Sequence, residues 1–352
     1  MSPAFRKALA DWYRRHARDL PWRHDANPYR VWVSEIMLQQ TRVEAVREHF
    51  TRFVKRFPTV RSLADADEED VLQAWSGLGY YRRARMLHAA AKLVVGRHEG
   101  RIPGTRADVL ALPGVGAYTA GAILSIAFNR PEPIVDGNVE RVFARLYALD
   151  DDVKSKSARA WLWRTAGEYI EGGAREGHSP GVLNQGLMEL GAVICKPAPD
   201  CPACPVRRWC KGNMRGNAAL LPIRPARPGM KTRRYLFAAV RDADDRVLMV
   251  RREQNDRGSL LPAGMWELPH TEWRGTKPDA WRSIEQAHGL QLRPCARVTN
   301  RKHTIMGYRL TLAVQPCAGD AVETANRRWF TTQEASNGAI ASATRKLLVC
   351  LT

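Results

Sequence analysis

Residues 105–128 read TRADVLALPGVGAYTAGAILSIAF, and this stretch predicts two helices joined by a tight, glycine-rich turn. Thr105 is a good helix N-cap, and Ala117 begins an apolar run with helical spacing directly after the turn. The turn itself is LPGVG, residues 112–116. Its glycines allow positive φ and bring backbone N–H groups towards a helix N-terminus, where an anion can bind. A phosphate-binding helix–hairpin–helix and an ordinary tight turn both fit this pattern.

Outward from this stretch, helical periodicity continues in both directions and predicts an all-α domain over residues 1–217. One long helix is expected to open at Asn27-Pro28 and to run towards Phe57. The proline-rich, basic residues 218–231 predict a stiff linker. Beyond it the periodicity moves towards two, which predicts a smaller α+β domain over residues 232–352.

The second domain should contain a hairpin, a further strand and a C-terminal helix. The hairpin is predicted from Tyr235–Arg241 and Val247–Arg251, on either side of an aspartate-rich turn. Tyr308–Val314 is the further strand, and Ile340–Leu351 is the helix.

Length and charge narrow the class of protein. The 352 residues favour two domains. The 55 Lys and Arg against 36 Asp and Glu give a formal net charge of +19, which favours a polyanionic partner. No apolar run approaches the roughly 18 residues of a membrane-spanning helix, and residues 1–20 lack the apolar core of a signal peptide. We therefore expect a cytoplasmic protein with no membrane partner.

Four of the seven cysteines lie within residues 195–210. They are Cys195, Cys201, Cys204 and Cys210, separated by five, two and five residues. Such a density indicates a metal centre, because disulfides are rare in a reducing compartment. Four cysteines can hold zinc or a [4Fe-4S] cluster. Zinc ribbons usually have two CxxC pairs, whereas one CxxC flanked by outer cysteines favours the cluster.

A glutamate lies in the most apolar part of the long N-terminal helix. Residues 31–38 read VWVSEIML, so apolar side chains surround Glu35 on nearly every face. Burial of that carboxyl raises its pKa towards the range of a general acid at neutral pH. The alternative is a buried ion pair between Glu35 and an arginine such as Arg18 or Arg23. Its position alone does not separate these two roles.

A second carboxyl group, that of Asp136, precedes a helix predicted over residues 139–149. Asp is a preferred N-cap, worth about 1 kcal/mol, so a structural role would explain it. A carboxylate at a helix N-terminus is also stabilised in its ionised form and can face a developing positive charge. One neutral and one ionised carboxyl form the pair that glycosidic bond cleavage needs.

Five motifs together resemble the MutY family of adenine DNA glycosylases, within the helix–hairpin–helix, iron–sulfur endonuclease III superfamily. They are VWVSEIMLQQT (31–41), GLGYY (77–81), LPGVG (112–116), VDGN (135–138) and the cysteine loop (195–210), in the family's order. The resemblance implies a two-lobed all-α glycosylase domain with a [4Fe-4S] loop, followed by a Nudix-like α+β domain. It also implies a base excision repair enzyme that removes adenine mispaired with 8-oxoguanine or guanine in double-stranded DNA.

The resemblance assigns roles to individual residues. Glu35 would protonate the adenine ring and later handle water, and Asp136 would stabilise the oxocarbenium-like sugar by charge or covalently, with Asn138 beside it. Tyr118 stands where bifunctional members carry a Schiff-base lysine, which implies a monofunctional enzyme. The residues implied to contact DNA or the extruded base are Trp22, Arg23, Gln39, Gln40, Thr41, Tyr80, Pro113, Gly114, Val115, Gly116 and Gln185.

Tyr80 is the implied wedge beside 8-oxoguanine, although Tyr80 and Trp22 could also be ordinary core aromatics. In the second domain, Gly258–Pro269 resembles the lesion-checking Nudix-like domain of the family. Nudix hydrolysis is not expected, because the following helix offers only Asp279 and Glu285 where a hydrolase has an acidic metal box. Where the family has Phe-Ser-His in its lesion loop, this chain has Ile305-Met306-Gly307-Tyr308 after His303-Thr304.

Two alternatives stay open. A bifunctional pyrimidine-lesion glycosylase of the same superfamily is opposed by Tyr118 and by the second domain. A catalytically silent iron–sulfur protein that binds DNA mismatches is opposed by Glu35 and Asp136. For the glycosylase we expect a nucleoid-associated monomer.

Overall fold

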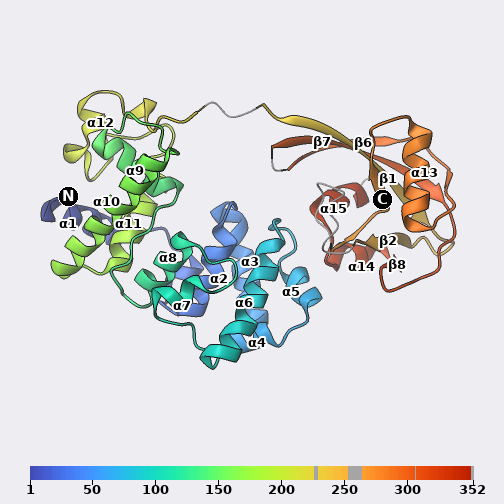
Figure 1. Cartoon of the computed structure of the whole chain (residues 1–352), viewed down its shortest axis with the longest axis horizontal. Helices are drawn as coiled ribbons and strands as arrows, with labels where there is room; N and C mark the ends of the chain where they lie inside the picture. The colour runs from blue at the N-terminus through green and yellow to red at the C-terminus, as the bar shows by residue number, and fades with distance from the viewer. Residues whose placement is uncertain (226–228, 253–263, 306, 350–352) are drawn as a thin grey trace. The chain divides into compact units, whose positions relative to one another are not determined.

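The structure is a computed structural model that describes residues 1–225, 229–252, 264–305 and 307–349. They form two compact units, Met1–Ala66 with Arg82–Ala226 and Asp67–Tyr81 with Arg227–Thr352. The first unit is helical and the second contains a sheet (Figure 1), which confirms the predicted fold classes. The division near Ala226 falls inside the predicted linker. The grouping of Asp67–Tyr81 with the C-terminal residues was not anticipated, and the domain bounds stay a prediction.

The first unit consists of helices in two lobes (Figure 1). One lobe contains α1 (Pro3–His16), α9 (Gly137–Tyr147), α10 (Lys156–Arg175), α11 (Pro180–Val193), η2 (Arg207–Trp209), α12 (Lys211–Met214) and η3 (Ala218–Leu220). The other contains η1 (Pro21–Arg23), α2 (Pro28–Leu38), α3 (Val43–Arg56), α4 (Val60–Ala64), α6 (Arg82–His98), α7 (Arg106–Leu110) and α8 (Ala117–Ala127). Helix α8 packs against both α2 and α11, so it joins the lobes.

The first lobe has a continuous apolar core. Leu9, Phe143, Tyr169 and Leu187, from four different helices, are each at most 1% exposed. Full burial of side chains of this size stabilises a fold by roughly 1.5–3 kcal/mol each. This core fixes α9 and α11, the two helices that bring polar groups to the site described below.

The predicted start of α2 is confirmed, and its predicted length is wrong. Asn27 caps the helix by accepting hydrogen bonds from two backbone N–H groups of the first turn. The helix ends at Leu38, and a separate helix begins at Val43. Gln40 has a φ of +59°, which breaks the helical path. Arg83 of α6 donates to carbonyl groups of the last turn of α2, so a distant side chain satisfies this helix end.

The second unit is built on an eight-stranded sheet with the order β3-β2-β1-β7-β5, in which β4 pairs with β1, β6 with β7 and β8 with β2. Its elements are α5 (Glu68–Ala74), β1 (Lys231–Arg241), β2 (Val247–Arg251), β3 (Trp266–Glu267), β4 (His270–Glu272), α13 (Lys277–His288), β5 (Arg293–Pro294), β6 (Thr299–Ile305), β7 (Tyr308–Ala318), β8 (Arg327–Phe330), α14 (Thr332–Asn337) and α15 (Ser342–Leu348). Strands β1 and β7 are parallel, and β1 with β2 forms the predicted hairpin.

Residues 235–240 of strand β1 are buried on both faces, as their unbroken apolar run suggests. Tyr235 and Phe237 join a core that includes α15, whereas Leu236 joins a second core with Ile284 of α13. The helix predicted over 340–351 is shorter, because Ile340 forms a β-bridge with Trp266 before α15 begins.

Parts of the predicted lesion loop (Met306) and of the Nudix-like segment (258–263) lie outside the described residues. The two carboxylates considered for a metal box have structural partners in α13 and its neighbourhood: Asp279 forms a capping box with Thr276, and Glu285 accepts a hydrogen bond from Leu292 N. Within the described ranges, no helix combines the length and the apolar character needed to cross a membrane.

Candidate active site

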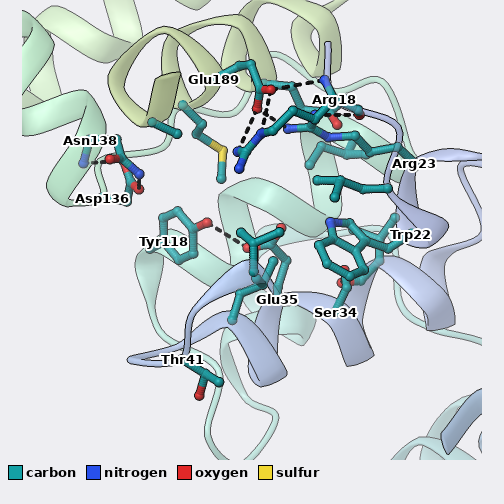
Figure 2. Close-up of a pocket in the computed structure, with 18 residues that line it drawn as sticks. Arg18, Trp22, Arg23, Ser34, Glu35, Thr41, Tyr118, Asp136, Asn138 and Glu189 are labelled. Atoms are coloured by element: carbon teal, nitrogen blue, oxygen red, sulfur yellow. Dashed lines mark hydrogen bonds and ion pairs between the residues drawn. The ribbon is translucent and has the colours of Figure 1, made fainter. Parts of the chain in front are cut away.

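The helical unit contains a cavity of about 210 Å³ between its two lobes (Figure 2). Its walls come from the loops after α1 and α2, from η1, α2, α8 and α11, and from the starts of α3 and α9. The lining residues are Arg18, Leu20, Trp22, Arg23, Val31, Ser34, Glu35, Leu38, Thr41, Val43, Tyr118, Ile126, Asp136, Asn138, Gln185, Met188, Glu189 and Ala192. All four residues expected to act in catalysis therefore border one cavity.

Glu35 is buried in the floor of this cavity, with 4% of its surface exposed. Tyr118 donates a hydrogen bond from Oη to Glu35 Oε2 at 2.6 Å. Burial raises the pKa of Glu35 from 4.5 to about 7, against the lowering effect of this hydrogen bond. A carboxyl with that pKa holds its proton in a large fraction of molecules at neutral pH, which suits a general acid.

The alternative role for Glu35, an ion pair with arginine, is not what the structure shows. Arg18 and Arg23 instead form ion pairs with Glu189 of α11, each at 2.8 Å (Figure 2). Burial acts to raise the pKa of Glu189, but hydrogen bonds from the two guanidinium groups lower it to about 2. Arg18 and Arg23, which could have kept Glu35 ionised, therefore pair with Glu189 instead.

Asp136 caps α9 and also faces the cavity. Its Oδ1 accepts hydrogen bonds from the backbone N–H groups of Asn138 (3.0 Å) and Val139 (2.7 Å), and its Oδ2 accepts one from Asn138 Nδ2 (2.8 Å). The helix therefore begins at Gly137 rather than at Val139 as predicted. Burial raises the pKa of Asp136, while its hydrogen bonds act in the opposite direction by favouring the carboxylate.

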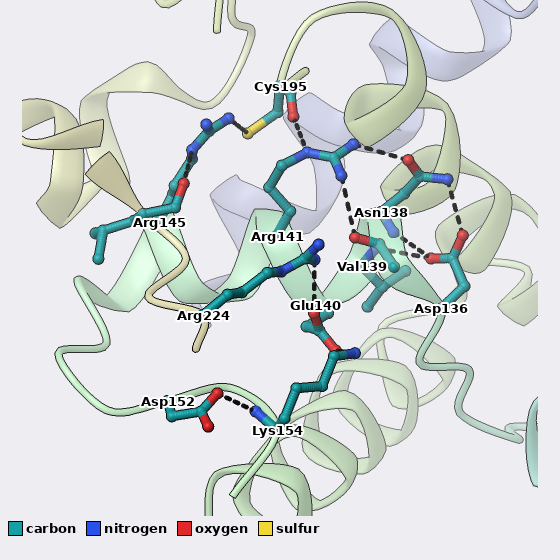
Figure 3. A network of polar contacts seen from close by, with 12 residues as sticks. Asp136, Asn138, Val139, Glu140, Arg141, Arg145, Asp152, Lys154, Cys195 and Arg224 are labelled. Carbon is teal, nitrogen blue, oxygen red and sulfur yellow. Dashed lines mark hydrogen bonds and ion pairs between the residues drawn. The ribbon is translucent and has the colours of Figure 1, made fainter. Parts of the chain in front are cut away.

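Asn138 is in turn held by Arg141 (Figure 3). Arg141 Nη2 donates to Asn138 Oδ1 at 2.8 Å, and Arg141 Nε donates to the carbonyl oxygen of Cys195 at 2.6 Å. Helix α11 passes so closely that a Cβ at Gly191 would lie 2.5 Å from Asn138 Cβ, so only glycine fits there. The amide of Asn138 is therefore fixed between Asp136 and the start of the cysteine loop.

The structure separates the other predicted contact residues into two groups. Trp22, Arg23, Thr41 and Gln185 line the cavity. Trp22 also packs edge-on against Phe50, so it is both a core aromatic and a wall residue.

Seven predicted contact residues do not line the cavity: the turn residues 113–116, described below, and Gln39, Gln40 and Tyr80. Gln39 donates to Thr119 Oγ1 at 3.2 Å, and Gln40 forms the turn after α2. Tyr80 belongs to the second unit. It is 47% exposed and has a φ of +48°, so it is not an ordinary core aromatic.

The glycine-rich turn adopts the geometry expected for a helix–hairpin–helix. Gly114 has a φ of +79°, and a Cβ there would lie 2.9 Å from Met86 Cβ. Val115 is buried and anchors the turn, while Gly116 is the exposed N-cap of α8. Pro113 and Gly114 are half-buried. The first N–H groups of the eleven-residue α8 thus follow an exposed glycine, which suits a backbone phosphate.

The four cysteines of residues 195–210 border a common cavity. Burial, together with the charges of the neighbouring cysteines, raises the pKa of Cys204 to about 12. Four thiolates in such a cavity repel one another unless a cationic centre compensates them, and this donor set fits an iron–sulfur cluster. Among the described residues, no three His, Cys, Asp or Glu side chains are grouped to hold a single metal ion.

Arg145 of α9 packs against the cysteine loop from the protein interior. Its side chain is almost fully buried, and Nη1 donates to Cys195 Sγ at 3.3 Å and to the carbonyl oxygen of Lys196 at 2.6 Å. Arg145 O also accepts a hydrogen bond from Cys210 Sγ at 3.4 Å.

Sequence reasoning missed Glu189 and Arg145. For Glu189 a signal was present, because this carboxyl stands in an apolar helix much as Glu35 does. For Arg145 no such signal exists, since arginines are common on exposed helix faces.

Comparison with known proteins agrees with this geometry. The family of HhH-GPD superfamily base excision DNA repair proteins matches residues 33–166, and the NUDIX domain family matches residues 236–349. The solved structure of a thermostable thymine-DNA glycosylase superposes with a TM-score of 0.53 at 28% identity, over 60% of this chain and 96% of that chain.

Curated relatives share more of the sequence. The adenine DNA glycosylase of Rattus norvegicus is 44% identical over 239 residues, which are 65% of this chain and 45% of the relative. The chain thus spans less than half the length of that relative. The adenine DNA glycosylase of Schizosaccharomyces pombe is 33% identical over 328 residues, which are 76% of this chain and 69% of the relative. With this similarity across both domains, the chain belongs to the adenine DNA glycosylase family.

Proposed function

We propose that this chain is a monofunctional DNA glycosylase that hydrolyses the N-glycosidic bond of adenine mispaired with 8-oxoguanine or guanine, in base excision repair. One observation carries the proposal. Glu35, with a pKa of about 7, and Asp136, held by helix N–H groups, border the same cavity. A proton donor and a carboxylate across one cavity are the groups that glycosidic cleavage uses.

In the proposed reaction, Glu35 donates its proton to a ring nitrogen of the extruded adenine. The bond between C1′ and the base then breaks with its electron pair leaving on the base. Asp136 stabilises the positive charge that develops on the sugar, by charge or through a covalent bond. Water adds to C1′ and gives its proton to the Glu35 carboxylate, which restores the acid.

Tyr118 supports the assignment as a monofunctional enzyme. A bifunctional glycosylase attacks the sugar with an amine, and the side chain at this position is a phenol whose Oη donates to Glu35. No Schiff base can form on it, so the product would be an abasic site with an intact backbone.

The DNA would be bound mainly through its phosphates. The net charge of +19 and the glycine-rich turn before α8 both favour a duplex backbone. Extrusion of the base costs a few kcal/mol of stacking, least at a mispair. Gln40, an exposed residue at positive φ, is proposed to lie at the vacated gap with Gln39 and Thr41, and Tyr80 is proposed as the wedge beside 8-oxoguanine.

We further propose that Cys195, Cys201, Cys204 and Cys210 hold a [4Fe-4S] cluster. When bound, the cluster would crosslink the cysteine loop. The basic residues of that loop, Lys196, Arg207, Arg208 and Lys211, would then be held in place to contact DNA. The Nudix-like unit is proposed to examine the opposing base rather than to hydrolyse a nucleotide, since Asp279 and Glu285 have structural roles.

The test is single-turnover release of adenine from a duplex with one A·8-oxoguanine pair. The parent chain should release adenine without forming a borohydride-trapped adduct, and Glu35→Gln should bind the duplex but release none. Glu176→Gln, which removes an ion pair with Arg6 outside the cavity, is the matched control and should remain active. Adenine release by Glu35→Gln at the parent rate would refute the assignment.

The cluster has an independent readout. Purified protein should be brown and contain about four iron atoms per chain. A colourless protein with one zinc per chain would overturn this part of the proposal without touching the glycosylase assignment.

A further inference from the structure

Glu189 is the one carboxylate of the cavity that the proposed reaction does not use. Its side chain is completely buried, and both carboxylate oxygens accept hydrogen bonds. Oε1 accepts hydrogen bonds from Arg18 N (3.0 Å) and Arg18 Nε (2.8 Å), and Oε2 accepts from Arg18 Nη2 (3.0 Å) and Arg23 Nη2 (2.8 Å). A single carboxylate on α11 therefore holds two guanidinium groups from a segment more than 160 residues away in the chain.

The segment held in this way forms one wall of the cavity. Arg18 and Arg23 flank Leu20 and Trp22, which both line the cavity. Arg23 Nη1 also donates to the carbonyl oxygen of Arg18 at 3.2 Å, so a hydrogen bond joins the two ends of this loop. Without Glu189, this loop would lose its hydrogen bonds to α11 and keep its internal contacts, among them the hydrogen bond from Arg23 N to Leu20 O and the ion pair of Asp19 with His24.

The ion pairs of Glu189 also affect the pKa of Glu35. The charge of Arg23 already lowers the pKa of Glu35, although burial outweighs it. Because Glu189 has a pKa of about 2, it is ionised throughout the working range and offsets one of the two guanidinium charges. Its removal would leave two positive charges on the cavity wall, and positive charge favours the ionised form of a nearby carboxyl.

The other charged groups around Glu35 do not replace this effect. Tyr118 of α8 donates a hydrogen bond that lowers the pKa of Glu35, and the Asp136 charge before α9 raises it. Arg83 of α6 is engaged with backbone carbonyls at the end of α2. Glu189 is thus the group placed to compensate Arg18 and Arg23.

From this arrangement, and resting on the proposed function, we infer that Glu189 is a positioning residue that fixes Arg18 and Arg23 on the cavity wall and keeps Glu35 protonated for catalysis. It acts through the arginines and need not touch the DNA. A residue of purely structural importance would change the rate equally at every pH, whereas this role predicts a shift along the pH axis.

The experiment is the pH profile of single-turnover adenine release. The rate should fall as Glu35 loses its proton, near pH 7 in the parent chain. In Glu189→Gln the fall should begin roughly one pH unit lower, so the loss of activity is large at alkaline pH and small in acid. Glu189→Asp retains the charge and should keep the parent midpoint. Glu176→Gln, which breaks a long-range ion pair with Arg6 elsewhere in the unit, should keep it too.

Two further measurements keep the inference testable if Glu189→Gln does not fold or if the parent chain is inactive. Arg23→Gln removes positive charge and should move the midpoint to higher pH, which tests the same electrostatics if Glu189→Gln does not fold. The titration of the Glu35 carboxyl can also be followed by ¹³C NMR on the full chain, with Glu35→Gln to assign the signal. This readout requires no activity, so an inactive parent would refute the proposed function while the inference is still tested. An unchanged Glu35 midpoint in folded Glu189→Gln would overturn the inference.

Discussion

Replacement of Glu35 by Gln should abolish excision and yet stabilise the helical unit at alkaline pH. The pKa of Glu35 is about 7 in the folded unit, against a usual value of 4.5. Because folding raises this pKa, the protonated carboxyl contributes fully below pH 4.5, and stability is lost as the pH rises through 7. The difference of 7 − 4.5 = 2.5 pH units, at about 1.4 kcal/mol per unit, corresponds to about 3 kcal/mol.

The assay is urea unfolding followed by circular dichroism, for the parent and the variant, from about pH 4.5 to about pH 9. Glutamine has nearly the shape of a protonated glutamate and retains an oxygen to accept from Tyr118. The two proteins should therefore be similar at the acid end, and the variant should be more stable by about 3 kcal/mol above pH 7. Subtraction of the two plots of unfolding free energy against pH removes the contribution of all other titrating groups. A difference that does not change with pH would refute the view that Glu35 is buried and protonated.

Glu176→Gln is the control of opposite sign. Arg6 lowers the pKa of Glu176, so this carboxylate stabilises the fold above its unfolded pKa, and that contribution is lost as the pH falls. The Glu176→Gln chain should thus be less stable than the parent at neutral pH, with a deficit that shrinks in acid.

Three further predictions concern the cavity and the turn. Tyr118→Phe removes a hydrogen bond that lowers the pKa of Glu35, so the alkaline fall of the excision rate should move upward by roughly one pH unit; a downward move would contradict the role given to this phenol. Asp136→Asn keeps a good N-cap, so the free energy of unfolding should change by less than about 1 kcal/mol while excision falls by orders of magnitude, and parent-like excision would exclude Asp136 from the chemistry. Gly114→Ala forces a Cβ against Met86 at positive φ and should cost roughly 1–3 kcal/mol in urea unfolding and weaken duplex binding, with unaltered binding and stability as the contrary result.

Much of the fold was predictable because its signals are local. Asn27 and Thr105 cap the helices they were expected to cap, and each needs only a side chain and the next three backbone N–H groups. The break between α2 and α3 was not predictable in this way. The carbonyl groups at this helix end accept from Arg83, which reaches Ile36 O from 47 residues further along the chain.

The candidate site was also predictable only where its signals are local in the sequence. The apolar surroundings of Glu35 are readable in eight consecutive residues, but its partner is not. Whether Arg23 pairs with Glu35 or with another carboxylate is decided by Glu189, 166 residues beyond Arg23. The helical phase of α11 and the packing of α1 against α11 place Glu189 there, and neither follows from a motif.

The two roles considered for Asp136, the observed helix cap and the proposed catalytic carboxylate, are compatible with one and the same arrangement. The N–H groups of Asn138 and Val139 bind its oxygen because α9 begins there, and they lower the pKa that burial alone would raise further. These donors and the helix dipole both favour the carboxylate form of Asp136, against the burial that raises its pKa. A buried carboxylate without such donors would take up a proton, as Glu35 does, and could not stabilise a cationic sugar. The two buried carboxyls of this cavity therefore differ in their donors: Tyr118 Oη donates to Glu35, and the first turn of α9 donates to Asp136.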